Sequence, residues 1–152
     1  CEQSARELSF TEKKQFAKEI RDAQADLVAL ALNASGKSNP SDISIYLMME
    51  GSLLSYNVFY VCQNRVVTLS DAEIDKAARM RSLKAGISSS KKLRAVYVKW
   101  GQPVPTETKM HYSLEAKKLD CVYSFDNVTD EVNGRTAATS FADWRRSIAL
   151  AL

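Results

Sequence analysis

The sequence predicts an α+β fold: an antiparallel sheet of about five strands with helices packed on one face, and a further C-terminal helix. Three observations predict it. Apolar residues recur every three or four positions between residues 16 and 31, the period of a helix with one buried face. Residues 43–62 and 106–125 instead show the two-residue period of strands. Short links at Glu50-Gly51 and at residues 115–118 divide these two runs into strand pairs, which favours antiparallel pairing.

Length and composition indicate a single domain spanning residues 1–152, with residues 1–8 as a flexible N-terminal segment. Hydrophobic residues make up 45% of the 152 positions and charged residues 26%, close to the globular average. A chain of this size can support a core without metals or disulfides. No apolar run approaches the roughly 18 residues that a membrane-spanning helix needs, so we expect the body of the chain to be soluble.

The first helix has a clear start. Ser9 and Glu12 have the spacing of a capping box, in which each side chain accepts a hydrogen bond from a free backbone amide. Residues 33–40 end the helix with a loop. Strands are expected at residues 43–49 and 53–62, where Glu50 and Gly51 supply a tight turn. A short third strand follows at 66–69.

A second capping box at Ser70 and Glu73 predicts a helix from Asp71 to about Gly86, with Leu69 packing on Ile74. We expect a break at residues 88–90. Two alternatives remain for residues 91–100. Positions 93, 96, 97 and 100 have helical spacing, whereas 96, 98 and 100 alternate as in a strand. Gly101 and Pro103 favour the helix because both are typical of helix ends.

The hairpin at residues 106–125 is predicted to have one buried and one wet face, with residues 115–118 as its link. One parity forms the expected core: Met110, Tyr112, Leu114, Cys121, Tyr123 and Phe125. Residues 128–139 are polar and include a tight turn at Asn133-Gly134. A cap at Ser140 and Asp143 predicts a short amphipathic C-terminal helix.

No catalytic or metal-binding constellation is evident, so we expect no enzyme, no cofactor and no metal. The single histidine, His111, lies on the polar parity of a strand and is interpreted as a solvated surface residue. Cys62 and Cys121 lie in apolar strand patterns, where free cysteine behaves as a small hydrophobe. None of the cysteines is near His111 in sequence, as a metal site would require.

Charge is distributed unevenly around a net value of +3. Residues 65–99 carry nine basic and three acidic side chains, whereas residues 100–131 carry three and six. Helical spacing should scatter part of the basic segment, so we interpret it as a solvated helix face and expect no nucleic-acid partner. The acidic hairpin residues are ordinary surface charges or a face that attracts a basic protein. They are Glu107, Glu115, Asp120 and Asp126.

Three segments of the chain resemble the YezG-like family of immunity and antitoxin proteins. They are ISIYLMMEGSLLSYNVFYV (43–61), GQPVPTETKMHYSLEAKKLDCVYSFDN (101–127) and DWRRSI (143–148). The resemblance implies a cytoplasmic bacterial protein that binds one cognate toxin, often a nuclease, and occludes its active site. For its partner-binding surface we expect Glu107, Glu115, Asp120 and Asp126, with Tyr123 as a less favoured aromatic anchor because its parity is that of the core.

Two other functions stay open. The chain starts with Cys1 rather than Met, so either it was trimmed or a signal peptide was removed and Cys1 carries a lipid. In the second case the protein would be an envelope lipoprotein, periplasmic and anchored in the outer membrane, acting as an assembly or inhibitor module. A small ligand-binding domain is the remaining alternative, and it requires a closed apolar pocket between sheet and helices.

Overall fold

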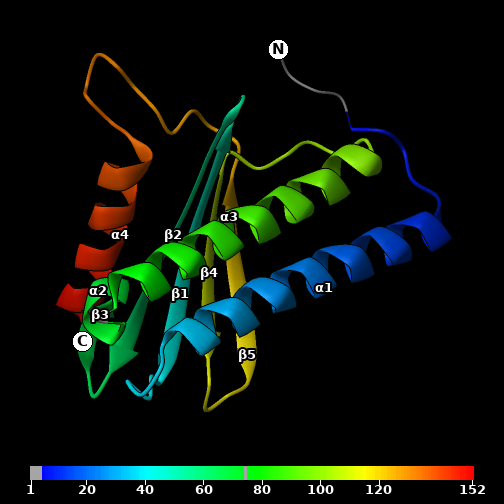
Figure 1. The fold of residues 1–152 in the computed structure, drawn as a ribbon. Coiled ribbons are helices and arrows are strands. Elements are labelled where there is room, and N and C mark those ends of the chain that lie inside the picture. The colour runs from blue at the N-terminus through cyan, green and yellow to red at the C-terminus, as the bar shows by residue number, and fades with distance from the viewer. Residues whose placement is uncertain (1–4, 74) are drawn as a thin grey trace.

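We describe a computed structural model of the protein, which covers residues 5–73 and 75–152 (Figure 1). The chain forms four helices and five strands within these residues. In chain order they are α1 (Phe10–Ala34), β1 (Asp42–Glu50), β2 (Leu53–Cys62), β3 (Arg65–Thr68), α2 (Leu69–Ala72), α3 (Lys76–Lys99), β4 (Glu107–Ser113), β5 (Lys118–Ser124) and α4 (Ala137–Ala151). The α+β fold predicted from the sequence is confirmed.

The five strands form one antiparallel sheet in the order β3-β2-β1-β4-β5. Two hairpins build β1 to β3 consecutively. Gly51 has a φ of +60° in the first turn, a left-handed conformation that glycine adopts without strain. After α3 the chain returns on the other side of β1 and adds β4 and β5. The hairpin of β4 and β5 therefore ends the sheet, and β5 is one of its two edges.

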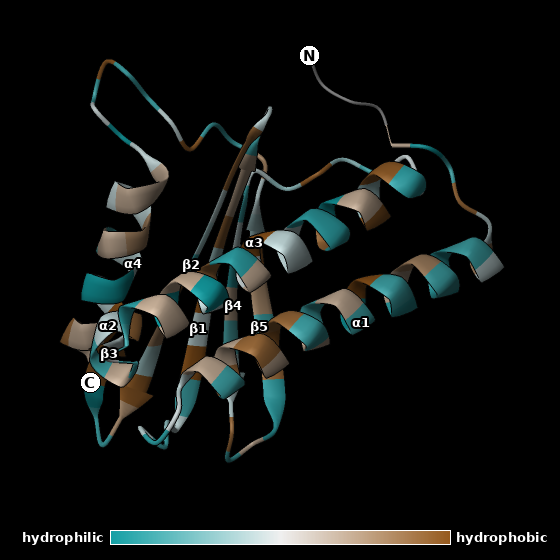
Figure 2. Ribbon diagram, viewed as in Figure 1, coloured by the Kyte–Doolittle hydropathy of each residue, from teal (hydrophilic) through white to brown (hydrophobic). Residues whose placement is uncertain are grey.

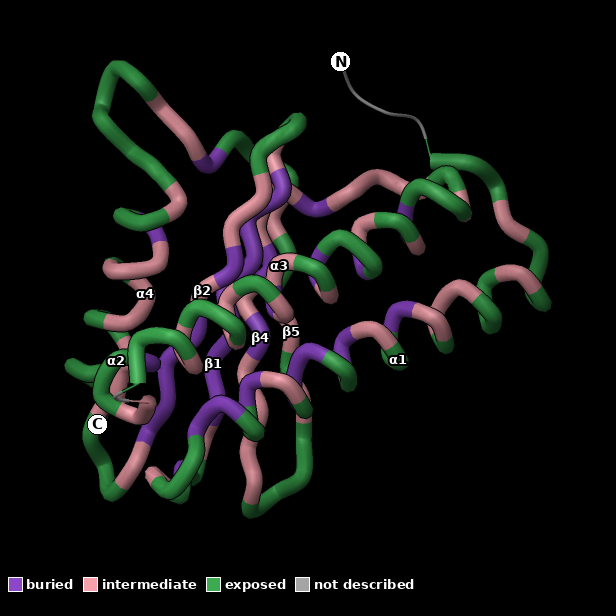
Figure 3. Tube along the Cα trace, viewed as in Figure 1, coloured by how far each residue is buried: buried purple, intermediate pink, exposed green. Residues whose placement is uncertain are grey.

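Helices α1 and α3 pack side by side on one face of the sheet, over the main core (Figures 1 and 2). Their inner surfaces meet alternate residues of the central strands, including the fully buried Ile45 and Tyr60. Helix α4 packs on the opposite face, over β2 and β3 and against Tyr46 of β1. There Trp144 lies 5.1 Å from the ring of Phe59 and 6.4 Å from that of Tyr46. The central strand β1 is consequently buried on both faces (Figure 3).

The predicted start of α1 is confirmed, because the side chains of Ser9 and Glu12 form both bonds of the capping box. The second predicted box, Ser70 with Glu73, is wrong: Thr68 and Asp71 cap the short helix α2 instead. A separate N-cap, Asp75, begins α3. The predicted packing of Leu69 on Ile74 falls on a residue outside the described ranges.

Helix α3 does not break at residues 88–90, contrary to the prediction. The hydroxyl of Ser90 donates to the carbonyl of Gly86, 2.7 Å away, so the serine side chain is satisfied within the helix and lies fully buried. The helical interpretation of residues 91–100 is confirmed: the helix runs to Lys99, and Gly101 follows with a φ of +63°.

The C-terminal helix is confirmed, but it starts earlier than expected. Thr136 is its N-cap and bonds reciprocally with Thr139, so the predicted cap at Ser140 and Asp143 is wrong. Both threonines supply the hydroxyl that an N-cap requires, one turn before the predicted position. The turn at Asn133-Gly134 is present, closed by backbone pairing of Asp130 with Arg135.

The predicted core parity of the second hairpin is correct in part. Met110 is fully buried, and its neighbours Tyr112, Leu114 and Cys121 are half-buried against the core. Tyr123 and Phe125, however, are 43% and 59% exposed. The reason is their place at the edge: β5 is the last strand, and Phe125 follows its final residue.

Candidate functional site: the acidic hairpin and its open edge

The four predicted carboxylates lie along the β4–β5 hairpin but do not form one cluster. Glu107 begins β4, and Asp120 sits on β5 opposite His111, four residues further along. At about 3.3 Å per residue, this separates their positions by roughly 13 Å. Glu115 is exposed in the link, and Asp126 is exposed beyond the other end of β5. Lys109 and Val122 face each other between the two strand residues.

Glu107 is a structural residue as much as a surface charge. Its Oε2 accepts a hydrogen bond of 2.7 Å from the hydroxyl of Tyr46, which is fully buried. Its side chain is only 16% exposed and lies 3.7 Å from the ammonium of Lys109. Burial, and then the bond to Glu107, raise the pKa of Tyr46 well above its usual value. The phenol therefore stays protonated and keeps donating.

Asp120 and Asp126 are more exposed than Glu107 and, within the described part of the chain, do not bond a buried side chain. The side chain of Asp120 is 60% exposed and pairs loosely with Lys118 at 3.7 Å. The backbone carbonyl of Asp126 accepts a 2.5 Å bond from the hydroxyl of Thr106, which leaves the carboxylate in solvent. Surface pairs of this kind contribute about 0–1 kcal/mol. These two carboxylates are available to a partner at little cost to the fold.

His111 is only partly solvated, in contrast to the interpretation from the sequence. Its Nε2 lies 2.6 Å from a carboxylate oxygen of Asp42, the first residue of β1. Both side chains remain accessible, at 41% and 32%. The pair lies on the same face of the sheet as α4, so the hairpin presents mixed charge on this face rather than a uniform acidic surface.

The edge strand β5 carries the largest exposed apolar surface of the hairpin. Val122 is 65% exposed on the face away from α1 and α3, while Tyr123 and Phe125 border the helix side. Figure 3 shows β5 as half-buried or exposed along its length, unlike β1 and β2. Sequence reasoning missed this edge. The usable signal was the long polar segment after residue 126, which offers no further strand to pair with β5.

An open apolar pocket of about 370 Å³ lies between α1 and the end of β5. Gln24 donates a 2.8 Å bond to the hydroxyl of Tyr123 across it, and burial raises the pKa of this tyrosine. The small-ligand alternative required a closed pocket between sheet and helices, and this one opens at the sheet edge. The lining residues are Phe16, Ala17, Ile20, Arg21, Gln24, Tyr97, Pro105, Tyr123 and Phe125.

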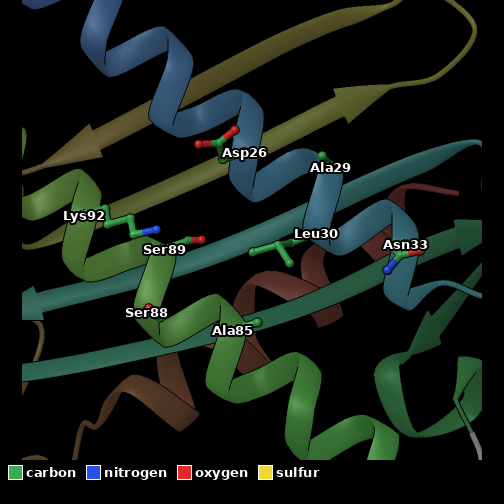
Figure 4. A pocket seen from close by; sticks show the side chains of 8 residues that line it. All are labelled: Asp26, Ala29, Leu30, Asn33, Ala85, Ser88, Ser89 and Lys92. Atoms are coloured by element: carbon green, nitrogen blue, oxygen red, sulfur yellow. The ribbon is translucent and has the colours of Figure 1, made fainter.

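A second, polar groove of about 600 Å³ separates α1 from α3 on the outer side of the helix layer (Figure 4). Small residues such as Ala29, Ala85 and Ser89 line it, together with Asp26 and Lys92. The short side chains explain the groove, because they let the helices approach while filling little of the space between them. No residue predicted as functional lies in this groove.

Helix α3 carries eight basic residues and no acidic one. The sequence predicted that helical spacing would scatter part of them, and this is confirmed for Arg79. Arg79 donates to the carbonyl of Glu73 on the inner side, and the other seven lie at exposed or half-exposed positions away from the sheet. They are Lys76, Arg81, Lys84, Lys91, Lys92, Arg94 and Lys99.

Several other predictions concern the cysteines, a metal site and the membrane. Cys1 falls among the residues that the structure does not describe, whereas Cys62 and Cys121 are free and half-buried. No three His, Cys, Asp or Glu residues gather as a metal site within residues 5–73 and 75–152. None of the described helices is long and apolar enough to cross a membrane. In comparisons with known proteins, no family model and no curated protein matches this chain.

Proposed function

We propose that this protein is a binding protein of the immunity or antitoxin type, which neutralises a cognate toxin domain by covering its active site. Two things support the proposal. The segments at 43–61, 101–127 and 143–148 resemble the YezG-like family. The β4–β5 hairpin, which belongs to the second of these segments, combines exposed apolar residues with accessible carboxylates.

The edge of β5 is the observation that carries the proposal. Val122, Tyr123 and Phe125 are 65%, 43% and 59% exposed and follow one another within four residues. Soluble proteins usually protect edge strands with charge, bulges or a covering element, because an open edge pairs with other chains. Asp120 and Asp126 flank the three residues. An apolar centre with a charged rim is the usual composition of a specific protein interface.

Charge and apolar surface would have separate roles in such a complex. Tyrosine and phenylalanine supply buried area at the centre, where most binding energy is concentrated. The carboxylates at the rim would favour a basic partner and speed its association rather than add much affinity. A nuclease active site, which attracts a polyanion, fits this chemistry. The protein acts by occlusion and needs no catalytic group of its own.

Co-expression with the product of the adjacent gene tests the proposal. We expect the two proteins to co-purify as a stable complex and the toxic activity of the neighbour to be suppressed. Reversing Asp120 and Asp126 to Lys should weaken the complex and leave the stability of the free protein almost unchanged. Failure of the two products to associate under any salt condition would remove the proposal.

A matched control separates local from global charge effects. Asp22→Lys with Asp143→Lys changes net charge by the same amount at two exposed carboxylates, each in a surface ion pair like that of Asp120. Both lie on helices rather than on the hairpin. We expect this variant to bind normally. Equal weakening by both variants would mean that net charge, not the hairpin, governs association.

A further inference from the structure

The helix layer extends beyond the edge of the sheet. The hydroxyl of Tyr60 in β2 donates to the carbonyl of Ala31, and Gln24 bonds Tyr123 in β5. Helix α1 thus crosses from β2 to β5 between these two residues, and residues 10–23 continue past β5 (Figure 1). They amount to roughly 20 Å of helix at 1.5 Å per residue, whereas neighbouring strands are about 4.8 Å apart.

The end of α3 accompanies this part of α1 and holds it in place. The rings of Phe16 and Tyr97 meet edge to face at 5.8 Å. Glu19 accepts a 2.8 Å bond from Lys99 and a 3.3 Å bond from the indole of Trp100. The overhang is therefore a packed pair of helices, and the apolar pocket of about 370 Å³ opens beneath it beside β5.

The backbone of β5 is oriented to accept such a strand. The amide of Met49 donates to the carbonyl of Thr106, so the even-numbered residues of β4 bond β1 and the odd-numbered residues bond β5. Their partners on β5 are the even-numbered residues. The alternation then directs the amides and carbonyls of Leu119, Cys121 and Tyr123 toward the open edge.

The side chains of the odd-numbered residues of β5 lie on the face of the sheet where the apolar pocket opens. In an antiparallel pair, residues directly opposite each other point to the same face of the sheet. A residue that pairs with Cys121 or Tyr123 would therefore point toward the helices, where Phe16, Ile20 and Phe125 line the pocket of about 370 Å³. The next residue along would point to the other face, on the side of Asp120 and Val122.

We infer that an extended segment of the protein partner adds to β5 as a sixth strand beneath the overhanging ends of α1 and α3. This inference rests on the proposed function. Strand addition supplies affinity through backbone bonds and specificity through alternate side chains. The pocket selects an apolar residue on one parity, and the carboxylates of Asp120 and Asp126 select basic residues on the other.

A second copy of the protein does not fit this site. Pairing β5 with β5 around a two-fold axis would put both helix layers on the same face of one continuous sheet. Each overhang would then need the space above the partner's β5, and the two helix pairs would collide. A lone strand lacks this obstruction, which is why the site favours a segment of a different protein.

Amide hydrogen exchange measured by NMR tests the inference on the complex obtained by co-expression. In the free protein the amides of Leu119, Cys121 and Tyr123 should exchange at least tenfold faster than those of Asp120 and Val122, which bond β4. In the complex all five should be protected. A complex in which the three outward amides keep exchanging at their free rate would overturn strand addition while leaving the proposed function intact.

A pair of substitutions at one position isolates the backbone bond. Cys121→Pro removes an outward amide and spares the ladder with β4, as an edge strand tolerates. Cys121→Ala removes the thiol alone. We expect the proline variant to bind its partner about tenfold more weakly than the alanine variant, with both folded by circular dichroism. Equal affinities of two folded variants would contradict the inference.

A synthetic peptide tests the site without the natural partner. The probe Lys-Val-Lys-Val-Lys-Phe-Lys-Val-Lys alternates basic and apolar residues, and its control has the same composition with the lysines grouped together. We expect the alternating peptide to protect the three outward amides and the control to leave them unchanged. If the natural complex fails to form but the alternating peptide binds, the proposed function fails and the strand site stands. Protection in neither experiment overturns the inference.

Discussion

Reversing the charge of Glu107 should destabilise the fold, although this residue was predicted to be an ordinary surface carboxylate. Glu107→Lys removes the acceptor of the buried Tyr46 hydroxyl. It also places a second cation two residues from Lys109 on the same face of β4. The equivalent change at Asp120, whose side chain is 60% exposed, removes only a surface ion pair with Lys118.

The expected magnitudes follow from these contacts. A hydrogen bond to a charged group contributes about 1.5–3 kcal/mol, and leaving a buried donor unsatisfied costs a similar amount. The half-exposed pair with Lys109 adds at most about 1 kcal/mol. We therefore expect Glu107→Lys to lower the free energy of unfolding by about 2–4 kcal/mol. Asp120→Lys should change it by less than about 1 kcal/mol.

Urea unfolding followed by circular dichroism measures both variants. With a slope of about 2 kcal/mol per molar urea, the midpoint for Glu107→Lys should fall by roughly 1–2 M. Glu107→Gln keeps an acceptor for Tyr46 and should cost much less. In a Tyr46→Phe background, Glu107→Lys should also cost less, because no hydroxyl is orphaned. Equal midpoints for the Glu107→Lys and Asp120→Lys variants would refute this reasoning.

Three further outcomes are expected. Gly86→Ala should destabilise by about 1–3 kcal/mol in thermal unfolding, because its Cβ would lie 2.2–2.5 Å from ring atoms of Tyr56; Ser88→Ala, on an exposed turn of the same helix, should not. Hydrogen bonds from residues 128 and 129 lower the pKa of Glu50, so its contribution to stability should be present above the ordinary value of about 4.3 and be lost as pH falls below it. The urea midpoints of wild type and Glu50→Gln should therefore converge on acidification, and a constant difference would contradict this. The basic face of α3 should bind duplex DNA only non-specifically, with a Kd no tighter than about 10⁻⁶ M at physiological salt in fluorescence anisotropy; a tighter, sequence-dependent complex would contradict the expectation of no nucleic-acid partner.

Local signals predicted most of the fold. The capping box at Ser9 and Glu12 and the apolar stripe after it depend on residues close in sequence, and the structure contains both. The strands were recognisable because their alternation is equally local. Ser90 shows the limit of this reasoning: serine is disfavoured in helix interiors because its side chain competes for backbone hydrogen bonds, but here the hydroxyl bonds back to residue 86 within a buried stretch of α3.

The candidate site was less predictable because it depends on distant partners. Glu107 and Tyr46 are separated by 61 positions, and only the register of β1 with β4 brings them together. Tyr123 has the parity of a core residue, yet its exposure depends on which strand ends the sheet. The local pattern of residues 106–125 therefore predicts neither the contact of Glu107 with Tyr46 nor the exposure of Tyr123.

The two proposals predict that the acidic residues contribute unequally to partner binding. Their charge alone would predict equal contributions. A strand that approaches the open edge meets Asp120 on β5 and Asp126 beyond it, whereas Glu107 lies one strand further in. We therefore expect Asp120→Asn and Asp126→Asn to weaken partner binding more than Glu107→Gln, which keeps the acceptor for Tyr46 and so reports on charge with little effect on stability. Dissociation constants of the three variants would decide the matter. If Glu107→Gln weakened binding most, the partner would lie across the face of the β4–β5 hairpin on the α4 side, beside His111 and Lys109, and not along the edge of the sheet.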